Sequence, residues 1–420
     1  MKAHVHPHTT GVKESATLAI NQTVSRLRSR GLDVCHLGFG ESPFPVPDAL
    51  EQALQQEAHR KSYLPTQGLP ELREAVAGFY RQRFGYDYHG SHVVVGPGSK
   101  ELLFQLMFLL DGPLILPSPC WVSYEPQARL CGKPVFSLPG RFEDAFRVDV
   151  QRLECLLGSM DRGQKILVLN SPNNPTGLSM SAEEAEVLGR LCRTHGVVVI
   201  SDEIYALTSE PQQPLHSLAH TWPEGTIVTG GLSKAFSAGG YRLGLALLPQ
   251  GMEDLRRALV STISETFSAV TAPVQYAALS VYGDYESVSE HVEACTRLHR
   301  QAGDWLAGQF RDMGLDCHRP SGGFYLFPGF APYREALAAR NITRATDLAR
   351  ALLEEAQVAV LPGGEFMVPD AWLHVRVASV DFDGARALEM LAQGEQDPER
   401  LFPSMYAGMN RLRHWLSELG

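Results

Sequence analysis

The sequence has no apolar run that approaches the roughly 20 residues needed to cross a bilayer. It also has no cluster of Lys and Arg, and its net charge of -10 at pH 7 opposes binding to nucleic-acid phosphates. The glycines near residue 96 complete neither the Gly-x-x-x-x-Gly-Lys-Ser/Thr nor the Gly-x-Gly-x-x-Gly pattern of nucleotide-binding loops. These absences exclude a membrane-spanning protein and argue against a nucleic-acid partner or a nucleotide loop.

The seven cysteines are scattered along the chain, and no two of them form a Cys-x-x-Cys pair. An odd number of scattered thiols favours a reduced, cytoplasmic protein over a disulfide framework or a zinc site. His4, His6 and His8 alternate near the N-terminus and could share one face of a strand, but a polar terminal tail is the favoured interpretation. We therefore expect no metal site.

The composition is that of a globular chain that is long enough for two cores, with 420 residues, 44% apolar and 20% charged. Between residues 92 and 247, short apolar runs alternate with helical stretches, which indicates an α/β fold with a mainly parallel sheet covered by helices on both faces. The predicted strands are residues 92–95, 113–116, 165–169, 197–201, 226–229 and 243–247. Ligands of such sheets lie beyond the carboxyl ends of the strands.

The rest of the chain predicts a smaller α+β unit. A long helix over residues 285–314 leads into a strand at 324–327, a helix at 345–355, strands at 358–361 and 373–378, and a helical tail. We predict an N-terminal segment (1–44) that packs on the small domain through a helix at 13–30, a large domain (45–300) and a C-terminal small domain (301–420).

Three polar motifs follow predicted strands. Residues 170–177 form the turn sequence Asn-Ser-Pro-Asn-Asn-Pro-Thr-Gly, Asp202 and Tyr205 follow the next strand, and Lys234 lies among small residues eight positions before Arg242. Taken singly, these features suggest a plain loop, a helix N-cap and a solvated lysine. Because the three strands share one rim, we predict one site, where an amine could form an imine and a guanidinium could hold a phosphate.

In this order the motifs resemble those of class I/II aminotransferases of fold type I, the aspartate aminotransferase superfamily, from about residue 37 to residue 378. The resemblance implies a mainly parallel seven-stranded sheet, a smaller α+β domain and pyridoxal 5'-phosphate (PLP) as the cofactor. It also implies transfer of an amino group from an L-amino acid to a 2-oxo acid.

The resemblance assigns chemical roles to four residues. Lys234 would form the Schiff base with the cofactor and later move a proton at the substrate α-carbon. Asp202 would lie beside the pyridine nitrogen and keep it protonated. Tyr205 and Asn174 would hydrogen-bond the phenolic oxygen of the ring.

Phosphate binding is assigned to five residues. Gly98, Ser99 and Lys100 precede a helix predicted at residues 101–110, and amides at the start of a helix bind anions. Ser233 and Arg242 would complete this site.

Two aromatic residues complete the predicted cofactor site. Trp121 resembles the aromatic residue that stacks on the pyridine ring. Tyr63 resembles the tyrosine that reaches the phosphate of the neighbouring subunit, which implies a homodimer with shared active sites.

For the substrate, the resemblance assigns the α-carboxylate to Arg376, Gly40 and Asn174. Lys100 matches a lysine that meets the distal carboxylate of acidic substrates in one bacterial branch, which favours aspartate or glutamate as the donor. Glu365 opposes this interpretation, because a buried carboxylate would favour a cationic substrate.

Two positions depart from the family pattern. Gly231 occupies a position where many relatives carry a hydroxyl residue, so Ser233 would have to compensate at the phosphate. Met367 follows Phe366 where many relatives have a glycine.

Three functional classes stay open at this stage. A transaminase is the first, and a β-lyase, decarboxylase or oxidase on the same scaffold is the second, because the cofactor motifs are common to all of them. A non-catalytic regulatory domain is the third, and the retained Lys234, Asp202 and Arg376 argue against it.

Overall fold

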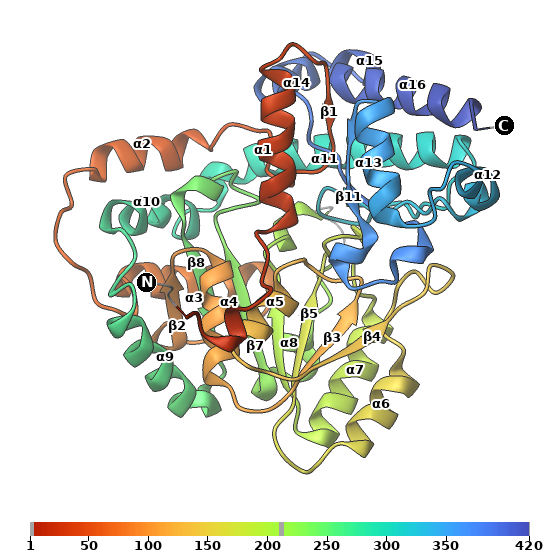
Figure 1. Cartoon of the computed structure of the whole chain (residues 1–420). Helices are drawn as coiled ribbons and strands as arrows, with labels where there is room; N and C mark the ends of the chain where they lie inside the picture. The colour runs from red at the N-terminus through yellow and green to blue at the C-terminus, as the bar shows by residue number, and fades with distance from the viewer. Residues whose placement is uncertain (1–3, 210–213, 420) are drawn as a thin grey trace.

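The computed structural model describes residues 4–209 and 214–419 and contains a central seven-stranded sheet. Along the sheet the order is β2-β8-β7-β6-β5-β3-β4 (Figure 1). All neighbours are parallel except β8, which is antiparallel to both β2 and β7. The predicted α/β fold with a mainly parallel sheet is thus confirmed. The strands are β2 (Val93–Gly96), β3 (Leu114–Ser118), β4 (Val135–Pro139), β5 (Ile166–Asn170), β6 (Val198–Asp202), β7 (Thr226–Gly231) and β8 (Gly244–Leu247).

Strand β4 has no counterpart among the six strands read from the sequence. It lies at the edge of the sheet and, among the residues that the structure describes, pairs with β3 alone. Its residues are mostly half-buried or exposed, and Phe136 is 39% exposed. An edge strand of this kind carries no continuous apolar run, which is the signal that marks the other strands.

Helices cover both faces of the sheet because alternate strand residues point to opposite sides. Val94, Val168 and Ile227 pack with one helical layer, whereas Val93, Val228 and Leu167 pack on the other side. The first layer comprises α4 (Ser99–Leu109), α5 (Tyr124–Leu130) and α9 (Glu253–Glu265). The second layer comprises α3 (Pro70–Phe84), α6 (Val150–Ser159), α7 (Ala182–His195), α8 (Leu218–Thr221) and α10 (Ala272–Tyr282), and α2 (Asp48–Glu57) packs on α10.

A second hydrophobic core joins the C-terminal part of the chain to residues near its start. Cys35, Leu37 and Phe44 belong to the same buried cluster as Leu306 and Val377. The helices that contribute side chains to this core, or that extend its layer, are α11 (Glu286–Asp312), α12 (Arg334–Ala339), α13 (Ala345–Glu355), α14 (Gly384–Ala392), α15 (Pro398–Leu401) and α16 (Pro403–Ser417).

The small strands of this core form two sheets. An antiparallel sheet has the order β11-β12-β9, with β9 (Tyr325–Leu326), β11 (Leu361–Pro362) and β12 (Val375–Ala378). Separately, β1 (Cys35–His36) pairs in parallel with β10 (Val358–Ala359). The prediction of a single strand at residues 358–361 is therefore wrong. Val360 separates β10 from β11, and these two short strands belong to different sheets.

The N-terminal helix α1 (Ala16–Arg28) lies across the front of the molecule in Figure 1. Its inner residues, Ile20 and Val24, pack against Val34 and Ala359 of the second core. The Arg28 guanidinium donates hydrogen bonds to the Val34 carbonyl and to Asp381 at 2.7 and 2.9 Å. Upstream of α1, the chain crosses to the other core, where Arg129 of α5 donates to the Thr10 carbonyl at 2.8 Å.

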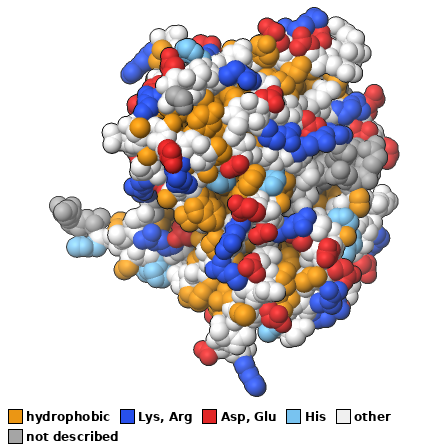
Figure 2. Space-filling view, turned by 90° about the vertical axis from the view of Figure 1, so that its right-hand side faces the viewer, with side chains coloured by type: hydrophobic (Ala, Val, Ile, Leu, Met, Phe, Trp, Pro, Cys, Tyr) orange, Lys and Arg blue, Asp and Glu red, His pale blue; other side chains and the backbone are white. Residues whose placement is uncertain are grey.

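Three further observations concern the surface charges, the helices and the thiols. On the face shown in Figure 2, Lys and Arg side chains are interspersed with Asp and Glu, without a broad area of one sign. No helix in residues 4–209 or 214–419 is long and apolar enough to span a membrane. All seven cysteines are free thiols.

Candidate active site

A cavity of about 390 Å³ lies at the carboxyl ends of β5, β6 and β7, between the two cores. Of the thirteen site residues predicted from the sequence, eleven line it: Gly40, Ser99, Lys100, Trp121, Asn174, Asp202, Tyr205, Ser233, Lys234, Arg242 and Arg376. Gly98 lies directly behind the wall, because a Cβ atom on it would come within 2.3 Å of Arg242 Nη2. Tyr63 lies elsewhere and is 93% exposed.

The register of the sheet places three polar residues side by side. Asn170 of β5 is opposite Asp202 of β6, and Asp202 is opposite Thr229 of β7. The Asp202 carboxylate is 3% exposed and accepts hydrogen bonds from the Tyr124 hydroxyl at 2.7 Å and the Thr229 hydroxyl at 3.2 Å. Burial raises the pKa of Asp202 to about 6 against the lowering effect of these bonds, so this carboxylate is costly to keep charged without a cationic ligand.

The turn after β5 is fixed by the side chain of Asn170. Its amide donates to the Asp202 carbonyl at 2.7 Å, and its oxygen accepts from the Asn174 backbone amide at 2.7 Å. The Asn174 side chain is 2% exposed, and its oxygen has no hydrogen-bond partner among the described residues. A buried polar atom without a partner is unfavourable, so this position is suited to a ligand with a matching polar atom.

Lys234 follows β7 and extends across the cavity. Its Nζ donates to the Gly40 carbonyl at 2.7 Å and lies 5.7 Å from the centre of the Tyr205 ring and 5.5 Å from that of Phe324. Gly40 itself has no room for a side chain, because a Cβ atom there would lie 2.0 Å from the Tyr325 hydroxyl. The amine thus meets a neutral carbonyl, which leaves it available to an aldehyde group.

Tyr205 and Arg376 are linked through Tyr325 of β9. The hydroxyl groups of Tyr205 and Tyr325 are 2.9 Å apart, and burial raises the pKa of Tyr205 well above its usual value, so its phenol stays protonated and can donate. The Arg376 guanidinium is 1% exposed, lies 4.9 Å from the Tyr325 ring centre and 5.4 Å from that of Phe366, and donates to the Gly38 carbonyl. Burial lowers the pKa of Arg376.

Arg376 has no carboxylate partner among the described residues, and its Nε lacks any hydrogen-bond acceptor there. A buried guanidinium without an anion is costly, and its forked donors match a carboxylate. This side chain is therefore suited to a small anionic ligand.

One end of the cavity has groups suited to binding an oxyanion. The amides at the start of α4 face it through Ser99, and the Arg242 guanidinium is held by the carbonyls of Gly239 and Pro97 at 2.8 and 3.3 Å. Gly98 has a φ of 90°, in the left-handed region that favours glycine, which lets the backbone turn into the helix.

Packing against the neighbouring strand explains why position 231 is a glycine. A Cβ atom there would lie 2.6 Å from the Leu243 carbonyl oxygen and 2.9 Å from the Gly244 Cα atom of the neighbouring strand. A hydroxyl residue would therefore require β7 and β8 to separate. Ser233 lines the cavity two positions later.

Lys100 and Trp121 line the same cavity as Lys234. The Lys100 Nζ lies 5.3 Å from the centre of the Trp121 ring, and burial together with Arg242 lowers the pKa of Lys100. Ser15 and Thr17 at the start of α1 line the same cavity. Glu365, in contrast, is exposed and does not line it, so the buried carboxylate considered from the sequence is absent at this position.

Sequence reasoning missed several residues that shape the site. Tyr124 and Thr229 bind Asp202, Tyr325 binds Tyr205, and Thr17 brings a buried hydroxyl that has no partner in the described residues. Tyr124 follows Trp121 by three positions and is the first residue of α5, and this closeness to a predicted site residue could have drawn attention to it. Tyr325 and Thr17 carry no local signal.

With this geometry established, comparison with known proteins identifies the class. A family model described as aminotransferase class I and II matches residues 33–388. The chain therefore belongs to the class I and II aminotransferase family. It is a transaminase, as the motifs predicted.

The relatives include an aspartate aminotransferase of Geobacillus stearothermophilus, 36% identical over 367 residues that cover 85% of this chain and 90% of that protein. An aspartate/prephenate aminotransferase of Thermus thermophilus is 33% identical over 390 residues, covering 91% and 96%. Among solved structures, the Thermus thermophilus aspartate aminotransferase with maleate has a TM-score of 0.86 at 29% identity, covering 98% of this chain and all of the other.

Enzymes of this family use PLP, and the cavity fits that cofactor. The helix start and Arg242 suit its phosphate, the buried Asp202 suits a protonated pyridine nitrogen, and Asn174 offers a buried amide. Lys234 has an amine in the same cavity that could react with the cofactor's aldehyde. No group of three or more His, Cys, Asp or Glu in the described residues could hold a metal ion.

Proposed function

We propose that this aminotransferase uses an acidic L-amino acid, aspartate or glutamate, as its amino donor. Lys100 carries the proposal, because it lines the same cavity as Arg376. An amino acid with two carboxylates could engage both cations. That a relative of similar fold is known with maleate, a dicarboxylate, supports this inference.

We propose that Lys234 holds the cofactor covalently and moves the proton at the substrate α-carbon. Bound PLP supplies a ring that withdraws electrons from that carbon. Asp202 keeps the ring nitrogen protonated, and Tyr205 and Asn174 donate to the phenolic oxygen. Arg376 binds the α-carboxylate together with the backbone of Gly40 and the Asn174 amide. These roles are supported by the convergence of the residues on one cavity.

The remaining roles concern the cofactor's phosphate and ring face. In our proposal, Ser99, Ser233 and Arg242 bind the phosphate with the amides of the Gly98 turn, and Trp121 stacks on the ring. Lys100 is adjacent to Ser99 in the sequence and lines the same cavity as Arg376, and we assign it to the substrate's distal carboxylate.

We also propose that the enzyme acts as a homodimer in the cytoplasm. Tyr63 points into solvent rather than into its own cavity, which is the placement expected of a side chain that completes a neighbouring subunit's phosphate site. Seven free thiols are consistent with a reducing compartment.

The donor is tested by a panel of L-amino acids against 2-oxo acid acceptors, with wild type and Lys100→Met. We expect the wild type to release one 2-oxo acid per site from aspartate or glutamate without an acceptor. Lys100→Met should raise KM for both acidic donors about ten-fold, as expected for the loss of one charge-assisted contact, and leave alanine and leucine unchanged. Arg162→Met, at an exposed basic residue that lines neither this cavity nor the pocket beside Lys100, is the control. A uniform loss across all donors would contradict the assignment.

A further inference from the structure

The segment that carries Tyr63 joins α2 to α3 and runs along the outside of the sheet, at the left edge of Figure 1. The Tyr63 side chain is almost fully exposed, so its position depends on the backbone on either side of it. On the upstream side, Arg60 pairs with Glu57 at 2.6 Å and lies over the Tyr276 ring at 4.2 Å. On the downstream side the anchor is Gln67.

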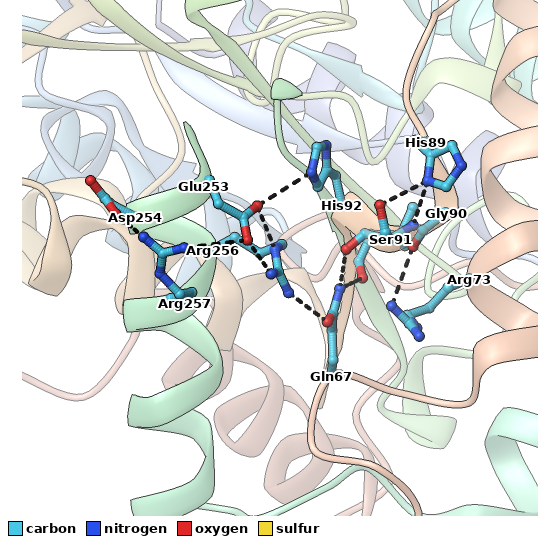
Figure 3. A network of polar contacts seen from close by, with 11 residues as sticks. Gln67, Arg73, His89, Gly90, Ser91, His92, Glu253, Asp254, Arg256 and Arg257 are labelled. Atoms are coloured by element: carbon cyan, nitrogen blue, oxygen red, sulfur yellow. Dashed lines mark hydrogen bonds and ion pairs between the residues drawn. The ribbon is translucent and has the colours of Figure 1, made fainter. Parts of the chain in front are cut away.

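Both polar atoms of the Gln67 side chain are hydrogen-bonded. Its side-chain amide donates to the Ser91 carbonyl at 2.6 Å and to the Val93 carbonyl at 2.9 Å, and its side-chain oxygen accepts from Arg256 Nη1 at 3.0 Å (Figure 3). Its backbone carbonyl accepts from the Val95 amide at 3.0 Å. The segment is thereby bound to the free edge of β2.

The next residue allows this close approach. A Cβ atom on Gly68 would lie 2.4 Å from Val95 Cγ2, and its φ of 110° lies in the region that favours glycine. The backbone therefore lies directly on β2 at this point.

Arg256 is itself held in place by Glu253, which in turn contacts His92. Glu253 accepts from Arg256 Nε at 3.0 Å and also from Nη2, and its carboxylate lies 3.4 Å from His92 Nε2. Figure 3 shows these side chains between α9 and the start of β2. Because Glu253 fixes the Arg256 guanidinium, Arg256 offers Gln67 a hydrogen-bond donor of defined position.

We infer that Gln67 is a positioning residue that holds Tyr63 at the phosphate of the partner subunit, so that it acts across the dimer interface rather than on its own active site. This inference rests on the proposed dimer and on the proposed role of Tyr63. The alternative is an effect within one subunit, since β2 leads from Val93 into the Gly98 turn of the same chain.

Hybrid dimers separate the two possibilities. Chains with two different affinity tags are assembled as dimers, and covalent PLP is measured by borohydride fixation as a function of PLP concentration. Only a site that contains Lys234 can be labelled in this way. The reference hybrid pairs a Lys234→Ala chain with wild type.

In the first test hybrid, Gln67→Ala and Lys234→Ala are on different chains, so the site with Lys234 receives Tyr63 from a chain with intact Gln67. We expect PLP affinity equal to the reference. In the second, both substitutions are on one chain, so the wild-type site receives Tyr63 from a chain that lacks Gln67. We expect about ten-fold weaker binding there, on the order of one lost phosphate contact.

Weakening in the first hybrid, or in neither, would overturn the inference. Tyr63→Phe in place of Gln67→Ala tests the underlying proposal: if it weakens only the second hybrid while Gln67→Ala changes nothing, the shared site stands and the role of Gln67 fails. A monomeric enzyme would overturn both.

Two matched variants test the anchor itself. Gln55→Ala removes an exposed glutamine of α2 that bonds only Glu51 among the described residues, and it should leave PLP affinity unchanged in every hybrid. Arg256→Ala removes one of the three side-chain bonds of Gln67 and should give a smaller loss with the same dependence on hybrid. Arg256→Ala without this dependence would contradict the inference.

Discussion

Replacing Asp202 with Asn should stabilise the cofactor-free protein near neutral pH while it disables the enzyme. Asp202 is buried and its pKa is raised from 3.8 to about 6. The folded state therefore binds a proton that the unfolded state has already lost between about pH 4 and pH 6. By linkage, this contribution to stability is present below pH 4 and is lost as the pH rises through 6.

The size of the effect follows from the pKa difference. About two pH units at about 1.4 kcal/mol each give a cost of about 3 kcal/mol at pH 7, which the Asp202→Asn variant would not incur. For unfolding of a chain of this length, the same free energy corresponds to a rise in Tm of about 3 °C, since the entropy of unfolding is about 2.1 cal/mol/K per residue. The Tyr124 and Thr229 hydroxyls can rotate to serve the isosteric amide.

The assay is thermal unfolding of both cofactor-free proteins at a fixed scan rate from pH 4 to pH 8. We expect the difference in Tm to grow from pH 4 to pH 6 and then to level off. Added PLP should raise the Tm of the wild type more than that of Asp202→Asn, because the ring nitrogen compensates the buried charge only in the wild type. Parallel Tm curves across the whole pH range would refute the argument that Asp202 is held at a cost.

Glu203 gives a matched comparison on the neighbouring position. Its carboxylate is also buried but accepts hydrogen bonds from Ser201, Ser217 and Tyr86 at 2.8, 2.5 and 2.8 Å, on the side away from the cavity. Burial raises its pKa to about 7. Glu203→Gln should therefore change the Tm over about pH 4.5 to 7, without the difference in response to PLP.

Three further outcomes are expected from substitutions in the cavity. Lys234→Ala should reduce turnover by at least about 10²- to 10⁴-fold and abolish borohydride fixation of PLP, whereas near-normal activity would remove its assigned role. Arg376→Ala should raise KM for amino acids about 10²- to 10³-fold, because a buried ion pair that loses one partner costs about 3–5 kcal/mol, and an unchanged KM would exclude the contact. Tyr124→Phe removes a 2.7 Å bond to Asp202 and should shift the pH of its stability transition upward by about one unit, read from the same Tm series.

The sequence predicted those parts of the fold that local patterns encode. The helix predicted at residues 345–355 matches α13, and the long helix at 285–314 matches α11 within two residues at each end. Strands buried on both faces were found, but β4 was missed because its contacts on one side are with solvent. The sequence predicted one strand in place of β10 and β11. These two strands differ in the strands with which they pair, and the local sequence does not show this difference.

In the site, too, the residues marked by local patterns could be predicted, whereas those brought in by distant contacts could not. Asp202 and Lys234 could be located because Asp202 ends β6 and Lys234 follows β7, and the carboxyl ends of both strands are predictable. Tyr325 could not, since it meets Tyr205 across 120 positions of sequence, and Thr17 reaches the cavity only because α1 docks on the second core. Contacts of this range depend on how the two cores sit together, and no local pattern encodes that.

The charged side chains in the cavity share one arrangement, in which each is held by neutral groups. Asp202 is bound by hydroxyl groups, Arg376 by a carbonyl and aromatic rings, and Lys234 by a carbonyl. Within residues 4–209 and 214–419, no ion pair joins Asp202 to Lys234, Arg242 or Arg376. If these groups paired with one another, the folded protein would gain stability and the ligand would have to break the pairs. Because each charge is instead solvated by neutral groups, a cofactor with a cationic nitrogen and a phosphate, and a substrate with a carboxylate, can each compensate one buried charge without displacing another.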